Sequence, residues 1–207
     1  MTNEIAPVRL TTAMLKGGGT RTTSAVFTAI DLARRDPTET VLLVDADTQN
    51  GTAYEWIDSA GDERPANLDA AYWPVSSFAD RALNYGAKHI VVDTGNDAVG
   101  LEQALTLTDH VLVTVKPSGS EIARVRPTLN VITSHPRAGA LNVAMLITRG
   151  KARTRSLADA QEVLSRVGDA RLLSTIIPEW ELYAQAYPTI PDELGAYPTA
   201  LDELLAR

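Results

Sequence analysis

The sequence predicts an α/β protein with a doubly wound, mostly parallel sheet that carries helices on both faces. Two observations lead to this fold class. Short runs of apolar and β-branched residues recur along the chain and alternate with longer segments of 3.6-residue periodicity. The apolar runs show little alternation with polar residues, which is typical of strands covered by helices on both sides.

The apolar runs define the expected strands. Five are clear, and a sixth at the start of the chain is weaker; they cover residues 41–47, 89–95, 110–116, 141–148, 171–178 and 8–15. The expected helices cover residues 22–35, 75–85, 99–107, 119–134, 157–167 and 198–205. Ligands of doubly wound sheets bind beyond the carboxyl ends of the strands. The loops that follow the strands are therefore where we look for chemistry.

The composition is that of an ordinary globular protein, and residues 1–207 are expected to form a single domain. The chain has 26 acidic and 19 basic residues, a net charge of −7. This balance excludes a basic coat over the whole surface, so any nucleic-acid contact must use a local patch. The absence of cysteine excludes disulfides, iron–sulfur ligation and thiol nucleophiles. The three histidines lie far apart and show no zinc spacing.

The sequence predicts a soluble, cytoplasmic protein without membrane attachment. No apolar run approaches the roughly 20 residues that cross a bilayer, and the first ten residues lack a signal-peptide pattern. The C-terminal stretch LDELLAR is amphipathic but acidic, whereas a membrane-surface helix favours basic residues on its polar face. The few aromatic residues are expected to pack in the core or in loops rather than to stack on bases.

A glycine-rich loop follows the first expected strand and precedes the first expected helix; it reads Lys16-Gly17-Gly18-Gly19-Thr20-Arg21-Thr22-Thr23. Three consecutive glycines let backbone N–H groups converge on an anion, and the helix N-terminus adds a positive dipole end. Lys16 and Arg21 add two positive charges, and Thr22 offers a hydroxyl to magnesium. The ordinary phosphate-loop pattern G-x-x-x-x-G-K-[ST] is not matched. Taken alone, the loop is equally compatible with a flexible turn whose basic residues are solvated.

Carboxylates end two of the expected strands. Asp45 and Asp47 close one apolar run, and Asp93 closes another. Burying charge is costly without a partner, and a magnesium ion with a water molecule to be activated would supply one. A strand-end aspartate of this kind is the usual Walker B arrangement. The alternative is that such an aspartate faces solvent and caps the next helix.

In these motifs the sequence resembles the ParA/MinD family of deviant Walker A P-loop ATPases, and most of all the small plasmid-partition ParA proteins. The family loop K-G-G-x-x-K-[ST]-[ST] is matched by Lys16, Gly17, Gly18, Thr22 and Thr23. The family pattern V-D-x-D-x-Q is matched by Val44, Asp45, Asp47 and Gln49, and its Walker B motif by Val92 and Asp93. The stretch MLITRGK at 145–151 resembles the family strand that ends near the adenine.

The resemblance implies a P-loop NTPase fold and a dimer that forms on binding ATP with Mg²⁺. It implies that Lys16 reaches the ATP phosphates of a partner subunit and that Asp47 helps to place the attacking water. It implies magnesium contacts from Thr22, Asp45 and Asp93. The remaining nucleotide contacts that it implies come from Gly17, Gly18, Gly19, Thr20, Arg21, Thr23, Thr148 and Pro178.

The chain departs from the family pattern at three places in these motifs. Arg21 replaces the usual P-loop lysine; it keeps the charge and can pair with phosphate oxygens, but it is planar and bulkier than an ammonium group. Thr20 replaces a glycine, and Thr48 stands where the family usually has proline. Phosphoryl transfer depends on exact positioning, so ATP binding is expected to survive these changes more readily than hydrolysis. Trp180 stands near a position where relatives often carry a basic residue.

Four basic residues lie within seven positions and have no acidic residue between them: Arg149, Lys151, Arg153 and Arg155. By the resemblance, such residues bind DNA without sequence preference in the ATP dimer, through phosphate contacts that weaken with salt. The alternative is a solvated loop whose bases interact with Asp159 and Glu162.

Three functions follow from these observations. The first is a weak Mg²⁺-dependent ATPase for plasmid or chromosome partition, which is nucleoid-associated and stimulated by a ParB-like centromere-binding protein. The second is an ATP-binding switch or scaffold that does not hydrolyse ATP, because Arg21 replaces the lysine. The third is a small-molecule ligase of the dethiobiotin synthetase type. The paired aspartates and Lys16 favour the first two.

Overall fold

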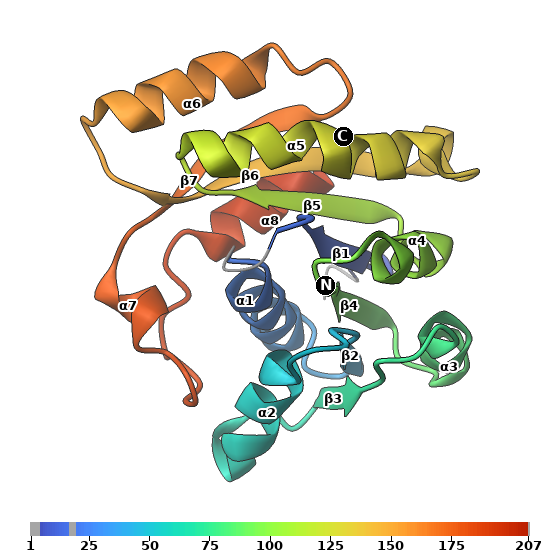
Figure 1. Cartoon of the computed structure of the whole chain (residues 1–207). Helices are drawn as coiled ribbons and strands as arrows, with labels where there is room; N and C mark the ends of the chain where they lie inside the picture. Colours follow the sequence, from blue (N-terminus) through green and yellow to red (C-terminus); the bar gives the residue numbers. More distant parts are fainter. Residues whose placement is uncertain (1–4, 17–19, 207) are drawn as a thin grey trace.

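A seven-stranded sheet forms the centre of the computed structural model, which describes residues 5–16 and 20–206 (Figure 1). The strand order is β3-β2-β4-β1-β5-β6-β7, and every neighbouring pair is parallel. The strands are β1 (Arg9–Ala13), β2 (Val41–Asp45), β3 (Leu68–Tyr72), β4 (His89–Asp93), β5 (His110–Val115), β6 (Asn142–Gly150) and β7 (Arg171–Pro178).

Helices cover both faces of this sheet. They are α1 (Arg21–Arg35), α2 (Thr52–Ser59), α3 (Phe78–Asn84), α4 (Ala98–Leu107), α5 (Gly119–Ser134), α6 (Arg155–Ser165), α7 (Glu181–Ala184) and α8 (Tyr197–Leu205), with short 3₁₀ turns η1 (Gly61–Glu63) and η2 (Ala138–Ala140). Helices α1, α2 and α8 pack on one face, and α3 to α6 pack on the other; Figure 1 shows α5 and α6 above the sheet and α1 below it. The predicted fold class, a doubly wound parallel sheet, is confirmed.

The apolar runs of the strands are continuous because successive side chains enter two different cores. Leu43 packs with α1, α2 and α8, whereas its neighbours Leu42 and Val44 pack with α3 and α4. All three side chains are fully buried. Burying one such side chain stabilises the fold by about 1.5–3 kcal/mol, so the two helical layers hold the central strands from both sides.

One strand and two helices of the structure are not among the predicted elements. Strand β3 has the sequence LDAAY, has no β-branched residue and lies at an edge of the sheet, where only Leu68 is buried. Its formation depends on pairing with β2 rather than on its own apolar pattern. Helices α2 and α7 are only eight and four residues long, which is too short for a clear periodic signal.

The other predicted elements are present within a few residues of their expected ends. Strands β2 and β4 end at Asp45 and Asp93, two residues before the predicted ends. The chain therefore leaves the sheet directly at the two carboxylates. Helix α6 begins at Arg155, two residues earlier than expected, so this base lies on the helix rather than in the preceding loop.

The topology brings the predicted motifs to one edge of the sheet. The chain leaves β1 toward β2, β3 and β4 on one side and later continues to β5, β6 and β7 on the other, so the strand order switches direction beside β1. In the register of the sheet, Asp93 lies beside Thr12 on one side and Asp45 on the other. Ligands of such sheets bind at this switch point.

Candidate nucleotide-binding site

The loop after β1 lies at the switch point and leads directly into α1. β1 ends at Ala13 and α1 begins at Arg21, with no side chain capping the helix from Thr20. The three glycines of the loop, Gly17, Gly18 and Gly19, lie outside the described residues. The first N–H groups of a helix lack intrahelical partners, so the N-terminus of α1 favours an anion beside this loop.

Arg21 is buried, and its guanidinium turns back onto the loop. Its Nη1 donates to the carbonyl oxygens of Met14 and Lys16, the second at 3.1 Å. Its Nε has no hydrogen-bond partner among the described residues. A buried donor without an acceptor costs about 1–3 kcal/mol. A phosphate oxygen is a suitable acceptor, so the arginine fits an anionic ligand even though it differs from the usual lysine.

Lys16 extends to the N-terminus of α5 in the same chain. Its Nζ donates to Ser120 Oγ at 2.8 Å and lies 3.2 Å from Glu121 Oε1. Glu121 is buried, and its Oε2 has no hydrogen-bond partner among the described residues, so Lys16 supplies the charge that this carboxylate requires. The contact of Lys16 with a second subunit stays a prediction. Nothing in the sequence singles out Glu121, which reads as an ordinary first-turn acid.

Asp93 is a buried carboxylate between β1 and the start of α1. Thr12 Oγ1 donates to Asp93 Oδ1 at 3.3 Å. Burial raises the pKa of Asp93 to about 6, although a hydrogen bond from Thr22 and the charge of Arg21 oppose the rise. A carboxylate buried in this way gains from a nearby cation.

The Thr22–Asp93 pair fits a magnesium ion. Mg²⁺ is commonly bound by one or two protein oxygens, with phosphates and waters completing its coordination. Thr22 offers a hydroxyl oxygen and Asp93 a carboxylate oxygen from the two elements that flank the loop. Within residues 5–16 and 20–206, no group of three or more histidines or acidic residues is arranged to hold a metal alone. The pair therefore suits a metal that arrives with a phosphate ligand.

Asp45 uses both carboxylate oxygens to hold the backbone that follows it. Oδ1 accepts the N–H of Asp47 at 3.1 Å, and Oδ2 accepts those of Ala53 and Tyr54 at 2.8 and 3.1 Å. Burial, followed by the nearby charge of Asp93, raises the pKa of Asp45 to about 7. These contacts bear out the capping part of the alternative, because Asp45 binds the first turn of α2. The other part is wrong, because Asp45 is fully buried and does not face solvent. Metal contact by Asp45 stays a prediction.

Asp47 lies in the loop after β2 and faces the loop after β4. Its Oδ1 accepts the N–H of Gln49 at 2.9 Å. A Cβ at Gly95 would lie 3.2 Å from Asp47 Oδ1 and 3.0 Å from Asp97 Oδ2, so this glycine leaves room for both carboxylates. Asp97 caps α4 through the N–H of Gly100 at 2.7 Å. Asp47 is thus placed where the ends of β2 and β4 meet, and its role in positioning water stays a prediction.

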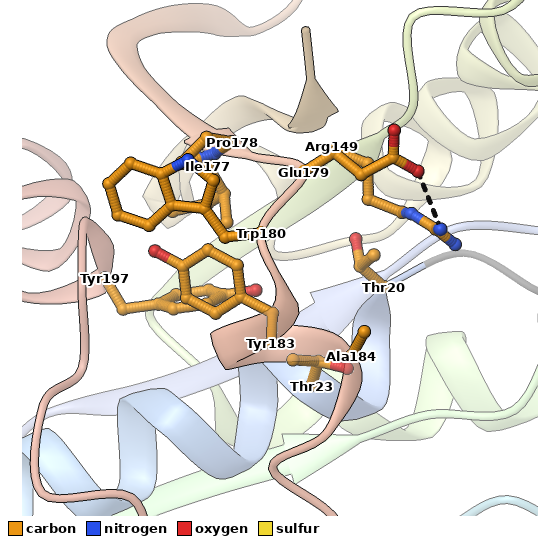
Figure 2. Close-up of a pocket in the computed structure, with 10 residues that line it drawn as sticks. All are labelled: Thr20, Thr23, Arg149, Ile177, Pro178, Glu179, Trp180, Tyr183, Ala184 and Tyr197. Carbon is orange, nitrogen blue, oxygen red and sulfur yellow. Dashed lines mark hydrogen bonds and ion pairs between the residues drawn. The ribbon is translucent and has the colours of Figure 1, made fainter.

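A cavity of about 310 Å³ opens between the first turn of α1 and the segment that follows β7. Figure 2 shows threonines of α1 and its cap on one side and aromatic rings on the other. The wall consists of Thr20, Thr23, Arg149, Ile177, Pro178, Glu179, Trp180, Tyr183, Ala184 and Tyr197. The cavity has a polar end beside the N-terminus of α1 and an apolar, aromatic end. A nucleotide likewise has a charged phosphate end and a flat aromatic base.

Thr148 and Pro178, two of the predicted nucleotide contacts, take different positions at this cavity. Pro178, the last residue of β7, forms part of the wall. Thr148 is fully buried behind the wall, where its Oγ1 accepts a hydrogen bond from Thr20 Oγ1 at 2.6 Å. Thr148 therefore connects the end of β6 to the loop rather than facing the cavity.

Three aromatic side chains of the wall are absent from the sequence-based assignment. Trp180 and Tyr183 lie in parallel planes, 2° apart, with ring centroids 6.2 Å from each other. Tyr197 contacts Tyr183 edge to face at 5.5 Å. Tyr197 belongs to the core, but the Trp180 side chain stays 56% exposed. The only local signal is the position of Trp180 and Tyr183 directly after a predicted strand.

Three of the four bases of the predicted basic patch (Arg149, Lys151, Arg153 and Arg155) are already paired with acids. Arg149 and Lys151 each lie 2.8 Å from an oxygen of the Glu179 carboxylate. The two cations, Lys151 first, hold the pKa of Glu179 below its usual range. Arg155 Nε lies 3.7 Å from Asp159 Oδ2. This pair agrees with the alternative in which the bases of the patch interact with nearby acids.

Arg153 makes no hydrogen bond or ion pair within the described part of the chain, and its backbone is left-handed at φ 62°. The sequence places the bases together but does not reveal Glu179, which comes from the loop after β7.

The helices of the described segments include none long and apolar enough to cross a membrane.

The fold brings the loop after the central strand β1 and the strand-end acids Asp45 and Asp93 together at the switch point of the sheet. Doubly wound α/β proteins bind their ligands at this position. Comparison with solved structures confirms the predicted resemblance at the level of the fold, because the similar structures are ParA/MinD-type ATPases.

A plasmid partition protein of Borrelia burgdorferi, crystallised with AMPPNP, matches 97% of this chain and 99% of its own with a TM-score of 0.72 and 22% identity. Cyanothece McdA without nucleotide matches 95% of this chain and 98% of its own (TM-score 0.70, 19% identity). A chain of the MinC:MinD cell division protein complex of Aquifex aeolicus matches 96% of this chain and 96% of its own (TM-score 0.69, 18% identity). No protein-family model and no curated protein sequence matches the chain.

Proposed function

We propose that this chain binds ATP with Mg²⁺ at the loop after β1, dimerises in that state and acts as a partition-type ATPase. One observation carries the proposal: the loop after β1, the Thr22–Asp93 pair and the cavity all adjoin the N-terminus of α1. The fold shared over almost the whole chain with a partition protein crystallised with AMPPNP supports it.

The residues of the site divide the work of binding. The N-terminus of α1, with residues 17–19 of the loop, would receive the phosphates, and Arg21 would pair with them through its unsatisfied Nε. Thr22 and Asp93 would hold magnesium, which supplies charge neutralisation for the phosphate oxygens when bound. Asp47 would orient the attacking water from the facing loop. The residues 1–207 would act as one nucleotide-binding domain.

Dimerisation requires a change at Lys16. To reach the phosphates of a second subunit, Lys16 must leave Ser120 and Glu121. When Lys16 leaves, the buried carboxylate of Glu121 loses its paired cation, which is unfavourable. Contacts of Lys16 with a triphosphate must offset this cost, so dimer formation depends on the nucleotide.

The basic patch suits non-specific DNA in the nucleotide-bound dimer. Its four bases contact phosphates without reading sequence, and a dimer presents two such patches. In this proposal the protein is cytoplasmic and nucleoid-associated, and a ParB-like centromere-binding protein stimulates it. Support comes from the local concentration of charge in an acidic chain and from the fold.

A second candidate, an ATP-binding switch or scaffold that does not hydrolyse ATP, rests on the observed geometry of Arg21. The guanidinium donates to the carbonyls of Met14 and Lys16 instead of extending from the loop. An arginine held by its own loop can bind a phosphate without stabilising the charge that develops during transfer. This candidate predicts tight ATP binding with no turnover.

The decisive experiment measures binding, mass and turnover on the same protein. ATP binding with Mg²⁺ is measured by calorimetry, the oligomeric state by light scattering, and phosphate release with and without DNA. Phosphate release that is lost in Lys16→Ala and Asp47→Ala supports the ATPase. Binding and dimerisation without release under every condition support the switch. A wild-type chain that binds no triphosphate and stays monomeric overturns both.

A further inference from the structure

We infer that this site selects its nucleotide by stacking the base on the indole of Trp180 and makes few hydrogen bonds to the edge of the base. It should therefore bind purine nucleotides more tightly than pyrimidine nucleotides, and adenine and guanine nucleotides with similar affinity. The inference rests on the proposed nucleotide site and deepens it. It departs from the sequence-based expectation that the aromatic residues only pack.

The stacking surface is the indole of Trp180. It borders the cavity opposite Thr20 and Thr23, and its plane is parallel to that of Tyr183 (Figure 2). The indole is 56% exposed although it is among the largest apolar side chains. It also lines a second, mostly apolar cavity together with Leu157, so core packing does not enclose the indole. An exposed flat ring beside a phosphate-type loop is suited to a base.

The hydroxyl groups near the base end of the cavity already have partners within the chain. The Tyr183 hydroxyl accepts a hydrogen bond and keeps an O–H that can donate. Few other side-chain hydroxyl donors are left to distinguish one base edge from another. The pairs are Thr20 with Thr148 at 2.6 Å, Tyr183 with the N–H of Ala196 at 3.0 Å, and Tyr197 with Ser24 at 3.0 Å.

The charged and backbone groups of the wall are engaged as well. Arg149 Nη2 donates to Glu179 Oε1 at 2.8 Å, so this carboxylate holds one N–H of the guanidinium. The carbonyl oxygen of Pro178 accepts the N–H of Trp180 at 3.1 Å. Thr23 lies at the α1 end of the wall, beside the phosphate side of the cavity. The base therefore meets mostly apolar faces.

This chemistry sets the expected selectivity. Sites that hydrogen-bond a substrate group reject analogues lacking it by roughly 10⁴- to 10⁵-fold, whereas apolar pockets discriminate by only about 10- to 200-fold. We expect ATP and GTP affinities within about tenfold of each other. CTP and UTP present a smaller ring to the indole and should bind at least about fivefold more weakly.

The test measures the affinity of the full chain for Mg²⁺ complexes of ATP, GTP, CTP, UTP and inorganic tripolyphosphate by calorimetry. Trp180→Ala should weaken ATP and GTP binding by about 5- to 150-fold, and Trp180→Phe should retain most of it. Tripolyphosphate affinity should not change in either variant, because it lacks a base. Trp73→Phe is the matched control, since Trp73 packs with the α3 and α4 core on the other face of the sheet.

Tryptophan fluorescence provides a second readout. ATP should quench the emission of Trp73→Phe but not that of Trp180→Phe. An ATP preference over GTP greater than about 100-fold, unchanged ATP affinity in Trp180→Ala, or an equal loss of tripolyphosphate affinity would each overturn the inference. If ATP binds to the wild type under any of these outcomes, the proposed nucleotide site stands without it. If no triphosphate binds, both are wrong.

Discussion

Glu179 restrains the basic patch, and its replacement is the most informative perturbation of the proposed DNA contact. Its carboxylate pairs with Arg149 and Lys151 at 2.8 Å each. Two of the four bases are therefore paired with one acid from the loop after β7. Glu179→Gln removes the negative charge while keeping the size of the side chain, so both bases become available to DNA phosphates without a change in the cavity wall.

The magnitude follows from counterion release. Each base that newly contacts a phosphate of double-stranded DNA steepens the plot of log affinity against log salt by about 0.9. Two released bases steepen it by up to about 1.8, which corresponds to up to about 60-fold tighter binding at 0.1 M salt. These values are upper limits, because DNA phosphates can also displace Glu179 from Arg149 and Lys151 in the wild type. The difference in affinity between the wild type and Glu179→Gln is smaller to that extent.

The assay is fluorescence anisotropy with a labelled duplex at several salt concentrations, with and without Mg·ATP. Glu181→Gln is the matched control: it removes the same charge two residues away, at an exposed side chain that makes no ion pair in the described structure. The Glu179→Gln effect should exceed the control in both affinity and salt slope.

Equal effects of Glu179→Gln and Glu181→Gln would refute the reasoning, since the gain would then reflect only the net charge. An increase in affinity with an unchanged salt slope would also contradict it, because released bases must add phosphate contacts. Lysine and arginine replacements are not needed for this test, so the patch itself stays intact.

Three further predictions concern the fold. Glu203 accepts hydrogen bonds from the N–H groups of Ser174 and Thr175 at 2.6 and 3.0 Å, where the pairing of edge strand β7 with β6 shifts register. Glu203→Ala should lower the free energy of unfolding by about 1–2 kcal/mol in urea titrations, and Glu203→Gln should lower it by less. The pKa of Asp45 rises from 3.8 to about 7 on folding, so between these pH values the folded state binds a proton that the unfolded state does not. The contribution of Asp45 to stability without ligand should therefore be greatest below pH 4 and decline as the pH rises to about 7. Asp45→Asn should flatten that decline in calorimetric melting, and an unchanged pH profile would contradict the reasoning. A Cβ at Gly150 would lie 2.5 Å from Ile176 Cγ2, so Gly150→Ala should cost about 1–3 kcal/mol, whereas Gly139→Ala, which meets no atom within 4 Å, should melt close to wild type.

Much of the architecture is visible in the chain itself. The central strands have continuous apolar runs because Leu42 and Leu43 enter different cores, and burial on both faces leaves no polar alternation. The loop and the strand-end acids lie next to these runs, so a parallel sheet alone brings Lys16, Asp45 and Asp93 to one edge. Strand β3 escapes prediction because it depends on its neighbour rather than on its own pattern.

The pairing of the functional side chains is different in kind. Lys16 meets Ser120 across 104 residues, and Arg149 meets Glu179 across 30. Such partners depend on which loops the strand order places together and on the rotamers that the packing permits. Local composition therefore determined the layers, the glycine-rich loop and the concentration of bases. Only the tertiary structure decided that an acid pairs with two of those bases and that an exposed indole lines a cavity with Thr20, because contacts between distant segments exist only once the sheet has been assembled.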